Sequence, residues 1–121
     1  MREAFFGRRK FEEFQSSLGI PRAVLAARLD RLVDEAMLVR LQYQDHPPRD
    51  EYRLTEKGRA FWEVLAAMWR WGSDWLWDEA GPPVVLKDRT TGSVVRPRVV
   101  DERTGEPVDL RRVRVGRSPQ R

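Results

Sequence analysis

The chain has 121 residues, 35% charged and 40% hydrophobic, which suits one domain with a modest core. It contains no cysteine, so disulfides, cysteine nucleophiles and thiolate metal sites are excluded. No apolar run approaches the ~20 residues of a membrane span, and no signal peptide is visible. We therefore expect a cytoplasmic protein without a membrane partner.

The positive net charge of +4 is unevenly distributed. Residues 1–86 carry 13 basic and 14 acidic side chains, whereas residues 87–121 carry 10 and 5. Because the basic surplus lies in the tail, net charge alone does not argue that the preceding region binds nucleic acid. That argument depends on where particular arginines lie. The basic tail itself could contact DNA, brace a dimer or be solvated.

The N-terminal residues 2–6 resemble the last turns of a helix, with Gly7 as its stop. A domain rarely begins this way, so we expect a chain that is short at its N-terminus or that borrows packing from a partner. A basic bend at residues 8–10 leads into a short helix over 11–18, which ends at Gly19. A short helix, a glycine turn and a second amphipathic helix are the parts of a helix-turn-helix.

The second helix is predicted over about residues 21–35, because Pro21 presets φ for a first helical turn. Leucines at 25, 29 and 32, with Val33 and Ala36, form one apolar face at helical spacing. The other face carries small side chains bordered by arginines, which suits a helix lying in a DNA major groove. The plainer alternative is an amphipathic helix with solvated arginines.

A β-hairpin is predicted next, since residues 39–43 alternate apolar and polar as a half-buried strand does. The turn spans residues 45–50, because its two prolines are unsuited to the interior of a paired strand. Residues 51–54 form the returning strand. The hairpin is a wing with Arg49 at its tip, and it completes a winged helix-turn-helix.

One long helix is predicted from Glu56 to about Glu79, capped by Thr55 and kinked at Gly72. All five tryptophans lie in it, more aromatic surface than one small domain can cover from one side. We therefore predict a homodimer. The predicted interface residues are Trp62, Leu65, Trp69, Trp75 and Leu76. The alternative is a pocket in which the tryptophans bind an aromatic small-molecule effector.

The tail beginning at Gly81 consists of short β-prone pieces broken by glycine and proline, with turns at Thr91-Gly92 and Thr104-Gly105. The fold class is therefore mainly α with a small β wing (α+β), comprising a winged helix-turn-helix, a long dimerisation helix and a short β-rich tail. We assign residues 1–80 to DNA binding and dimerisation and 81–115 to the tail. Residues 116–121 are expected to be disordered.

Three blocks in this order resemble a known family: AFFGRRKFEEFQSSLGIPRAVLAARLDRLVDEAML, YQDHPPRDEYRLTEKG and a tryptophan-rich helix with WRWGSDWL. The chain resembles the HxlR-type transcriptional regulators, which are winged-helix dimers related to the MarR class. The run from Pro47 to Gly58 is the most diagnostic. The chain departs from the family by lacking its first helix and its cysteines, and its tail resembles a zinc ribbon without the thiolates that zinc needs.

The resemblance implies double-stranded DNA as the partner and assigns roles to individual residues. Candidate DNA contacts are Arg22, Ala23, Ala26, Arg28, Arg31, Arg49, Arg9 and Tyr43. Arg28 and Arg31 could instead pair with Asp34 and Glu35 on the same helix. Arg49 and Arg9 could be solvated, and Tyr43 could pack within the hairpin together with Tyr52.

The function predicted from these residues is a sequence-specific DNA-binding transcriptional regulator. In it, residues 21–35 would occupy the major groove and the wing, 43–52, would lie at the minor groove. A protein-interaction module built on a truncated winged helix, without DNA binding, is the alternative. The lone His46 sits in a turn, and no acidic pair has a catalytic partner, so no enzyme activity, cofactor or metal is expected.

Overall fold

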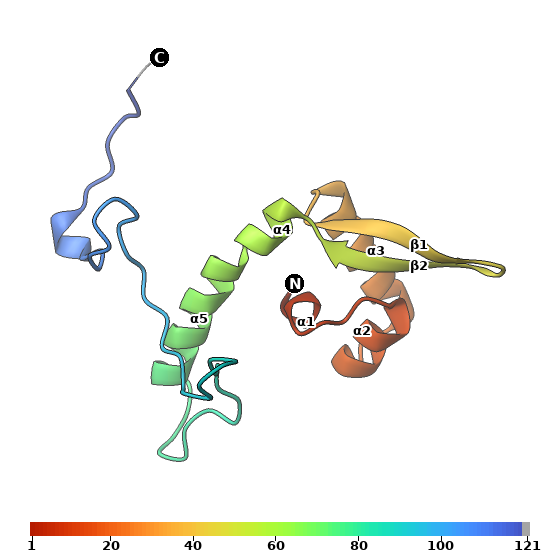
Figure 1. Ribbon diagram of the computed structural model, residues 1–121, viewed down its shortest axis with the longest axis horizontal. Coiled ribbons are helices and arrows are strands. Elements are labelled where there is room, and N and C mark those ends of the chain that lie inside the picture. Colours follow the sequence, from red (N-terminus) through yellow and green to blue (C-terminus); the bar gives the residue numbers. More distant parts are fainter. Residues whose placement is uncertain (120–121) are drawn as a thin grey trace. The chain divides into compact units, whose positions relative to one another are not determined.

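The computed structural model describes residues 1–119, which divide into two compact units, residues 1–65 and residues from 66 onward. In chain order the elements are α1 (Arg2–Phe5), α2 (Phe11–Leu18), α3 (Arg22–Asp34), β1 (Leu38–Asp45), β2 (Pro48–Leu54), α4 (Glu56–Ala60), α5 (Trp62–Trp75) and a 3-10 helix, η1 (Leu110–Arg112). Figure 1 shows them coloured along the chain.

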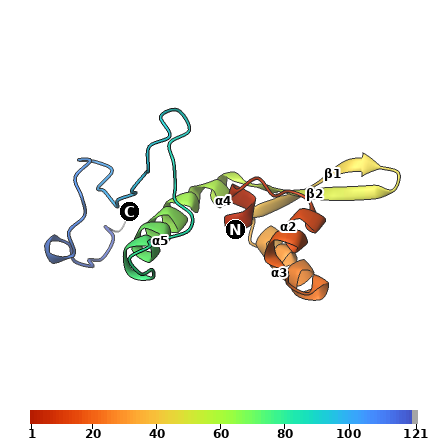
Figure 2. The same cartoon turned by 90° about the horizontal axis from the view of Figure 1, so that it is seen from below.

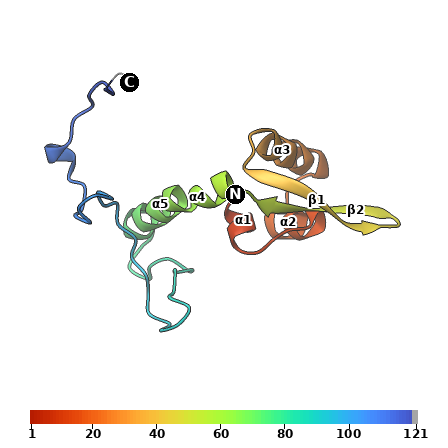
Figure 3. The same cartoon turned by 45° about the horizontal axis from the view of Figure 1, so that its top comes forward.

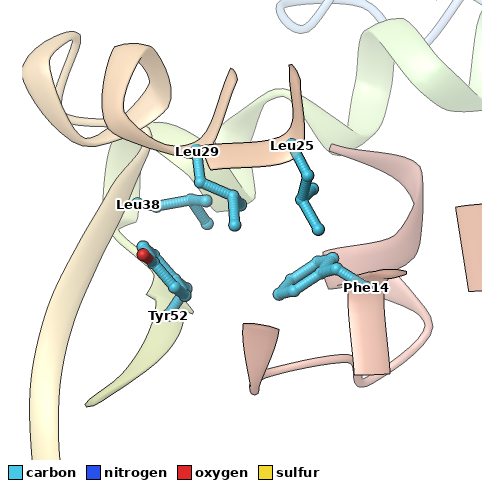
Figure 4. Packing of buried hydrophobic residues seen from close by; sticks show 5 residues of the cluster. All are labelled: Phe14, Leu25, Leu29, Leu38 and Tyr52. Atoms are coloured by element: carbon cyan, nitrogen blue, oxygen red, sulfur yellow. The ribbon is translucent and has the colours of Figure 1, made fainter. Parts of the chain in front are cut away.

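The core of the N-terminal unit lies between α2, α3 and the base of the hairpin. Its buried side chains are Phe14, Leu25, Leu29, Leu38 and Tyr52 (Figure 4). Phe14 meets the Tyr52 ring edge-on, with 6.3 Å between ring centroids. Leu25 and Leu29 come from the apolar stripe of α3, so the opposite face of that helix is turned away from the core.

The turn between α2 and α3 follows the sequence prediction. Gly19 ends α2 in the left-handed conformation, with φ of 63°, and its N–H bonds to the Gln15 carbonyl. Pro21 precedes the first helical residue, Arg22, and its carbonyl accepts a hydrogen bond from Leu25. Helices α2 and α3 pack together, and Figure 2 shows them side by side. The predicted helix-turn-helix is confirmed.

The two strands form an antiparallel hairpin whose tip projects beyond the helices (Figures 1 and 3). The predicted turn is present at residues 46–47, but its predicted bounds of 45–50 are too wide, because β1 extends to Asp45 and β2 already begins at Pro48. Pro48 pairs with Asp45 as the first residue of its strand, a position where proline is tolerated. A bulge between Gln42 and Gln44 leaves Tyr43 out of the register.

The predicted burial of β1 is also wrong. Val39, Leu41 and Tyr43 are exposed, and the buried residue of the strand is Leu38. Strand alternation places Leu38 on the face that packs against α3, which leaves the odd-numbered side chains on the opposite face. Of the two tyrosines, Tyr52 packs into the core, whereas Tyr43 is 39% exposed.

The predicted single helix over 56–79 is interrupted at Phe61 and ends at Trp75. Phe61 donates its N–H to the Gly58 carbonyl three residues back, which tightens the last turn of α4 before α5 begins. Gly72 lies within α5, and the kink predicted there stays a prediction. Beyond the helix, the Asp78 carboxylate accepts a bond from the Ala80 N–H, which favours a turn over continued helix.

The tail of the C-terminal unit contains two similar turns, each led by an aspartate. Asp88 Oδ1 accepts the N–H groups of Thr90 and Thr91, and these backbone bonds lower the pKa of Asp88. Asp101 Oδ1 likewise accepts from Arg103. Gly92 and Gly105 have φ of 73° and 72°, so both predicted turns are confirmed.

Regular β structure in the described tail is limited to two isolated bridges, Lys87 to Val94 and Val100 to Pro107. The boundary proposed at residue 80 and the zinc-ribbon resemblance stay predictions. The expected disorder of 116–121 falls partly on residues 120 and 121, which lie outside the described residues.

Candidate nucleic-acid interface

The outward face of α3 carries the residues that the sequence singled out. Ala23, Arg28 and Arg31 are exposed, and Ala26 is half-buried. Across residues 1–119 neither Arg28 nor Arg31 forms an ion pair, so the alternative pairing with Asp34 and Glu35 is not observed. Their guanidinium groups are therefore available to an external anion.

Arg22 occupies the first turn of α3 and is held by an aromatic ring of α2. Its guanidinium carbon lies 4.4 Å from the centroid of the Phe11 ring, a cation–π contact that holds the Arg22 side chain against α2. This stacking leaves the Arg22 side chain exposed. The arrangement places a positioned cation at the end of the helix that enters the groove in helix-turn-helix proteins.

Arg9 and Tyr43 lie close to the hairpin but are held differently. The Arg9 carbonyl accepts a 2.7 Å hydrogen bond from Tyr52 N–H, so its backbone runs beside β2 while its side chain is exposed. The Nζ of Lys10 lies 4.8 Å from the centroid of the Tyr43 ring. Because Tyr43 sits at the bulge, its ring is directed toward Lys10 rather than into the core.

Arg49 is an exposed residue near the tip of the wing, opposite Gln44 in the register. The tip of the hairpin projects away from α3 (Figure 3), so the helix and the wing present separate surfaces. The structure thus places Arg22, Arg28, Arg31 and Ala23 on α3, and Arg49 apart from them on the wing.

Sequence reasoning missed an ion pair between α3 and the β1 strand of the wing. Arg40 of β1 donates to Asp30 of α3 at 2.6 Å, and its guanidinium also lies 5.4 Å from the centroid of the Tyr52 ring. The pair joins residues ten positions apart on different elements, so helical spacing could not reveal it. Strand alternation offered one signal, because Arg40 shares a hairpin face with Leu38.

The predicted dimer residues differ in exposure. Trp62 contacts Phe5, with 5.4 Å between ring centroids, and Leu65 and Trp69 are half-buried. Trp75 and Leu76 are 73% and 64% exposed, and Met68 and Trp71, earlier in α5, are exposed as well. Burying such residues against a partner would remove apolar surface from water.

No group of three or more histidine, aspartate and glutamate side chains within residues 1–119 could hold a metal ion. The described helices are too short or too polar to cross a membrane.

The structure contains a helix-turn-helix, a hairpin packed on the core, and arginines on the outward side of α3. These features together define a winged-helix DNA-binding protein. Residues 1–80 match the family described as HxlR-like helix-turn-helix, and the chain belongs to that family.

Relatives carry the same description. The HTH-type transcriptional regulator Rv3095 of Mycobacterium tuberculosis is 40% identical over 113 residues, which cover 93% of this chain and 72% of Rv3095. The HTH-type regulator sll1512 of Synechocystis is 40% identical over 81 residues, covering 66% of this chain and 60% of that protein.

Solved structures agree with this fold. The crystal structure of PA1607, described as a candidate transcription factor, superposes with a TM-score of 0.86 at 38% identity, covering 97% of this chain and 82% of that one. PA1374 of Pseudomonas aeruginosa, also described as a candidate transcription factor, gives a TM-score of 0.74 at 36% identity over 98% and 80% of the two chains. The protein is a DNA-binding transcriptional regulator.

Proposed function

We propose that this regulator binds duplex DNA as a homodimer, with α3 of each subunit in a major groove and the β1–β2 wing along the neighbouring minor groove. The observation that carries this proposal is the division of α3. One side is buried through Leu25 and Leu29, and the other presents small side chains with Arg28 and Arg31 free of ion pairs among the described residues.

The small residues matter because a helix must come close to base edges to read them. Ala23 and Ala26 keep the N-terminal half of α3 narrow, and Arg22 can donate to base edges or phosphates beside them. Arg49 on the projecting wing is suited to the narrow, electronegative minor groove. Arg9 and Tyr43 add phosphate contacts along the hairpin.

Two-fold symmetry follows from the proposed dimer, so the preferred site is pseudo-palindromic. The exposed side chains of Trp75 and Leu76 support a dimer, and Leu65 and Trp69 are half-buried. A small-molecule effector bound among the tryptophans is the remaining alternative use of that surface. A regulator of this class acts where the chromosome is, so we place it in the cytoplasm.

A fluorescence titration of a labelled duplex tests the proposed contacts. The double variant Arg22→Ala/Arg49→Ala should bind at least about tenfold more weakly than wild type, because it removes two phosphate or base contacts per subunit. The matched control Arg89→Ala/Arg103→Ala removes two exposed cations from the tail turns. Equal losses in the two double variants would refute the assignment of α3 and the wing.

A further inference from the structure

Arg40 is a cation of β1 that connects the hairpin to the recognition helix α3. Its Nη2 donates to Asp30 Oδ1 at 2.6 Å, and its guanidinium lies over the ring of buried Tyr52. Tyr52 foremost, and then Asp30, raise the pKa of Arg40 above its ordinary value, so the group is charged whenever DNA could bind. Arg40 therefore has two contacts within the protein, although its side chain stays partly exposed to water.

The ion pair contributes little to folding by itself. The side chains of Asp30 and Arg40 are 59% and 43% exposed, and exposed pairs of this kind stabilise proteins by about 0–1 kcal/mol. Removing either partner leaves a charge that water can solvate. The ion pair therefore matters more for the binding of an external molecule than for the stability of the fold.

Asp30 lies on the side of α3 that faces away from the core. It follows Ala23 by seven residues and Ala27 by three, so all three share the outward face of the helix. A carboxylate on a face that approaches phosphates repels them, and the repulsion grows as water is displaced between the two surfaces. Without a partner, Asp30 would oppose the binding that the neighbouring arginines favour.

We propose that Arg40 is a positioning residue for DNA binding, which neutralises Asp30 on the outward face of α3. The inference rests on the proposed DNA-binding function. Arg40 acts through Asp30 and needs no phosphate contact of its own. Its planar guanidinium suits this role because one side can stack on Tyr52 while an edge donates to the carboxylate.

A double-mutant cycle tests the proposal by measuring duplex affinity at constant low salt. Arg40→Gln should weaken binding about fivefold when residue 30 is Asp, because the carboxylate is then uncompensated. In the Asp30→Asn background the same Arg40→Gln change should alter affinity by less than about twofold. Arg40→Lys, which retains the charge, should bind within about twofold of wild type.

Arg53→Gln is the matched control, because Arg53 pairs with Glu51 on the opposite face of the hairpin. The DNA affinity of the Arg53→Gln variant should stay close to that of wild type. Thermal unfolding of every variant establishes that it is folded. If Arg40→Gln does not fold, the affinities of Arg40→Lys and Asp30→Asn supply the comparison. Asp30→Asn is then expected to bind DNA more tightly than wild type.

The outcomes separate this proposal from the proposed function. Equal losses from Arg40→Gln in both backgrounds would mean that Arg40 contacts phosphate directly, and no loss in either would mean that the pair is only structural. Either result overturns the inference while leaving DNA binding intact. Failure of the wild-type protein to bind duplex DNA would instead refute the proposed function, and the inference with it.

Discussion

Gly58 illustrates how a single residue constrains the N-terminal unit. It is buried in α4, and a Cβ built there would lie 2.1 Å from the carbonyl oxygen of Met37. Real Cβ atoms do not approach backbone oxygen so closely, so only glycine lets α4 pack against the chain that joins α3 to β1. This is a physical reason for the glycine that ends the most diagnostic run of the sequence.

Substituting Gly58→Ala should therefore destabilise the protein by about 2–4 kcal/mol, because backbone on both sides must shift. Gly72→Ala is the matched control, since its Cβ would meet only Leu76 Cδ1 at 3.6 Å within a helix. That variant should gain about 0.5–1 kcal/mol from helix propensity. Urea unfolding of both variants measures the difference, and equal stabilities would contradict the close approach.

Ala36 lies in the left-handed region with φ of 58°, where glycine is the usual residue. It ends α3 in a Schellman motif, in which Ala36 N–H bonds to Val33 and Met37 N–H bonds to Leu32. Ala36→Gly should stabilise the protein by about 0.5–1 kcal/mol by removing the steric cost at Cβ. A lower melting temperature for this variant would contradict the account of the helix end.

Glu3 is a buried carboxylate, 5% exposed, that accepts a hydrogen bond from Ser17 and pairs with Arg2. The Ser17 hydroxyl contributes most to lowering the pKa of Glu3 below its ordinary value of 4.5. A group whose pKa is lower in the folded state stabilises the fold above its unfolded pKa and loses that contribution as pH falls. Melting temperatures of wild type and Glu3→Gln should therefore converge as pH falls below about 4.5. A constant difference between pH 3 and 7 would show that the Glu3 charge is not linked to folding.

At the scale of elements, the C-terminus of α3 is held by residues that begin α4. Thr55 Oγ1 donates to the Ala36 carbonyl, and the same oxygen accepts the Gly58 N–H at 3.0 Å as an N-cap. Lys57 Nζ donates to the Glu35 carbonyl at 2.7 Å, where a cation also complements the helix dipole. These bonds fix the end of the recognition helix relative to the helix that follows the wing.

Thr55→Val should destabilise the protein by about 1–2 kcal/mol, since it removes the cap while keeping the shape of the side chain. Thr55→Ser keeps the hydroxyl and should remain within about 0.5 kcal/mol of wild type. Urea unfolding of the two variants measures the difference in their free energies of unfolding. A serine variant as unstable as the valine variant would show that methyl packing, rather than the hydrogen bonds, matters at this position.

Local signals in the sequence predict a helix over 11–18 and a second over about 21–35, observed as Arg22–Asp34, because apolar spacing and Gly19 act within the segment itself. The start of β2 at Pro48 and the break at Phe61 depend on pairing and on hydrogen bonds that no periodicity encodes. The residues of the candidate DNA-binding site also fall into a predictable and an unpredictable group. Outward residues of α3 follow from helical geometry, whereas the contacts of Arg22 with Phe11 and of Asp30 with Arg40 join different elements.

At the scale of the whole molecule, exposed aromatic side chains at the end of α5 support the proposed dimer. Trp75→Ser/Leu76→Ser should lower the fraction of dimer in light scattering by several-fold, because each change removes about 1.5–3 kcal/mol of burial per side chain. Leu110→Ser is the control, since Leu110 is 86% exposed but lies in η1, far along the chain from Trp75 and Leu76. An unchanged mass for the double variant would place the dimer interface elsewhere.

The salt dependence of duplex binding by the wild-type protein tests the central claim most directly. A dimer that presents Arg9, Arg22, Arg28, Arg31 and Arg49 from each subunit should release counterions from the phosphates it contacts. We predict that log K falls linearly with log salt, with a slope of about −4 or steeper. Absence of binding at low salt, or an affinity that does not change with salt, would contradict a DNA-binding role for this face and favour a protein-interaction module.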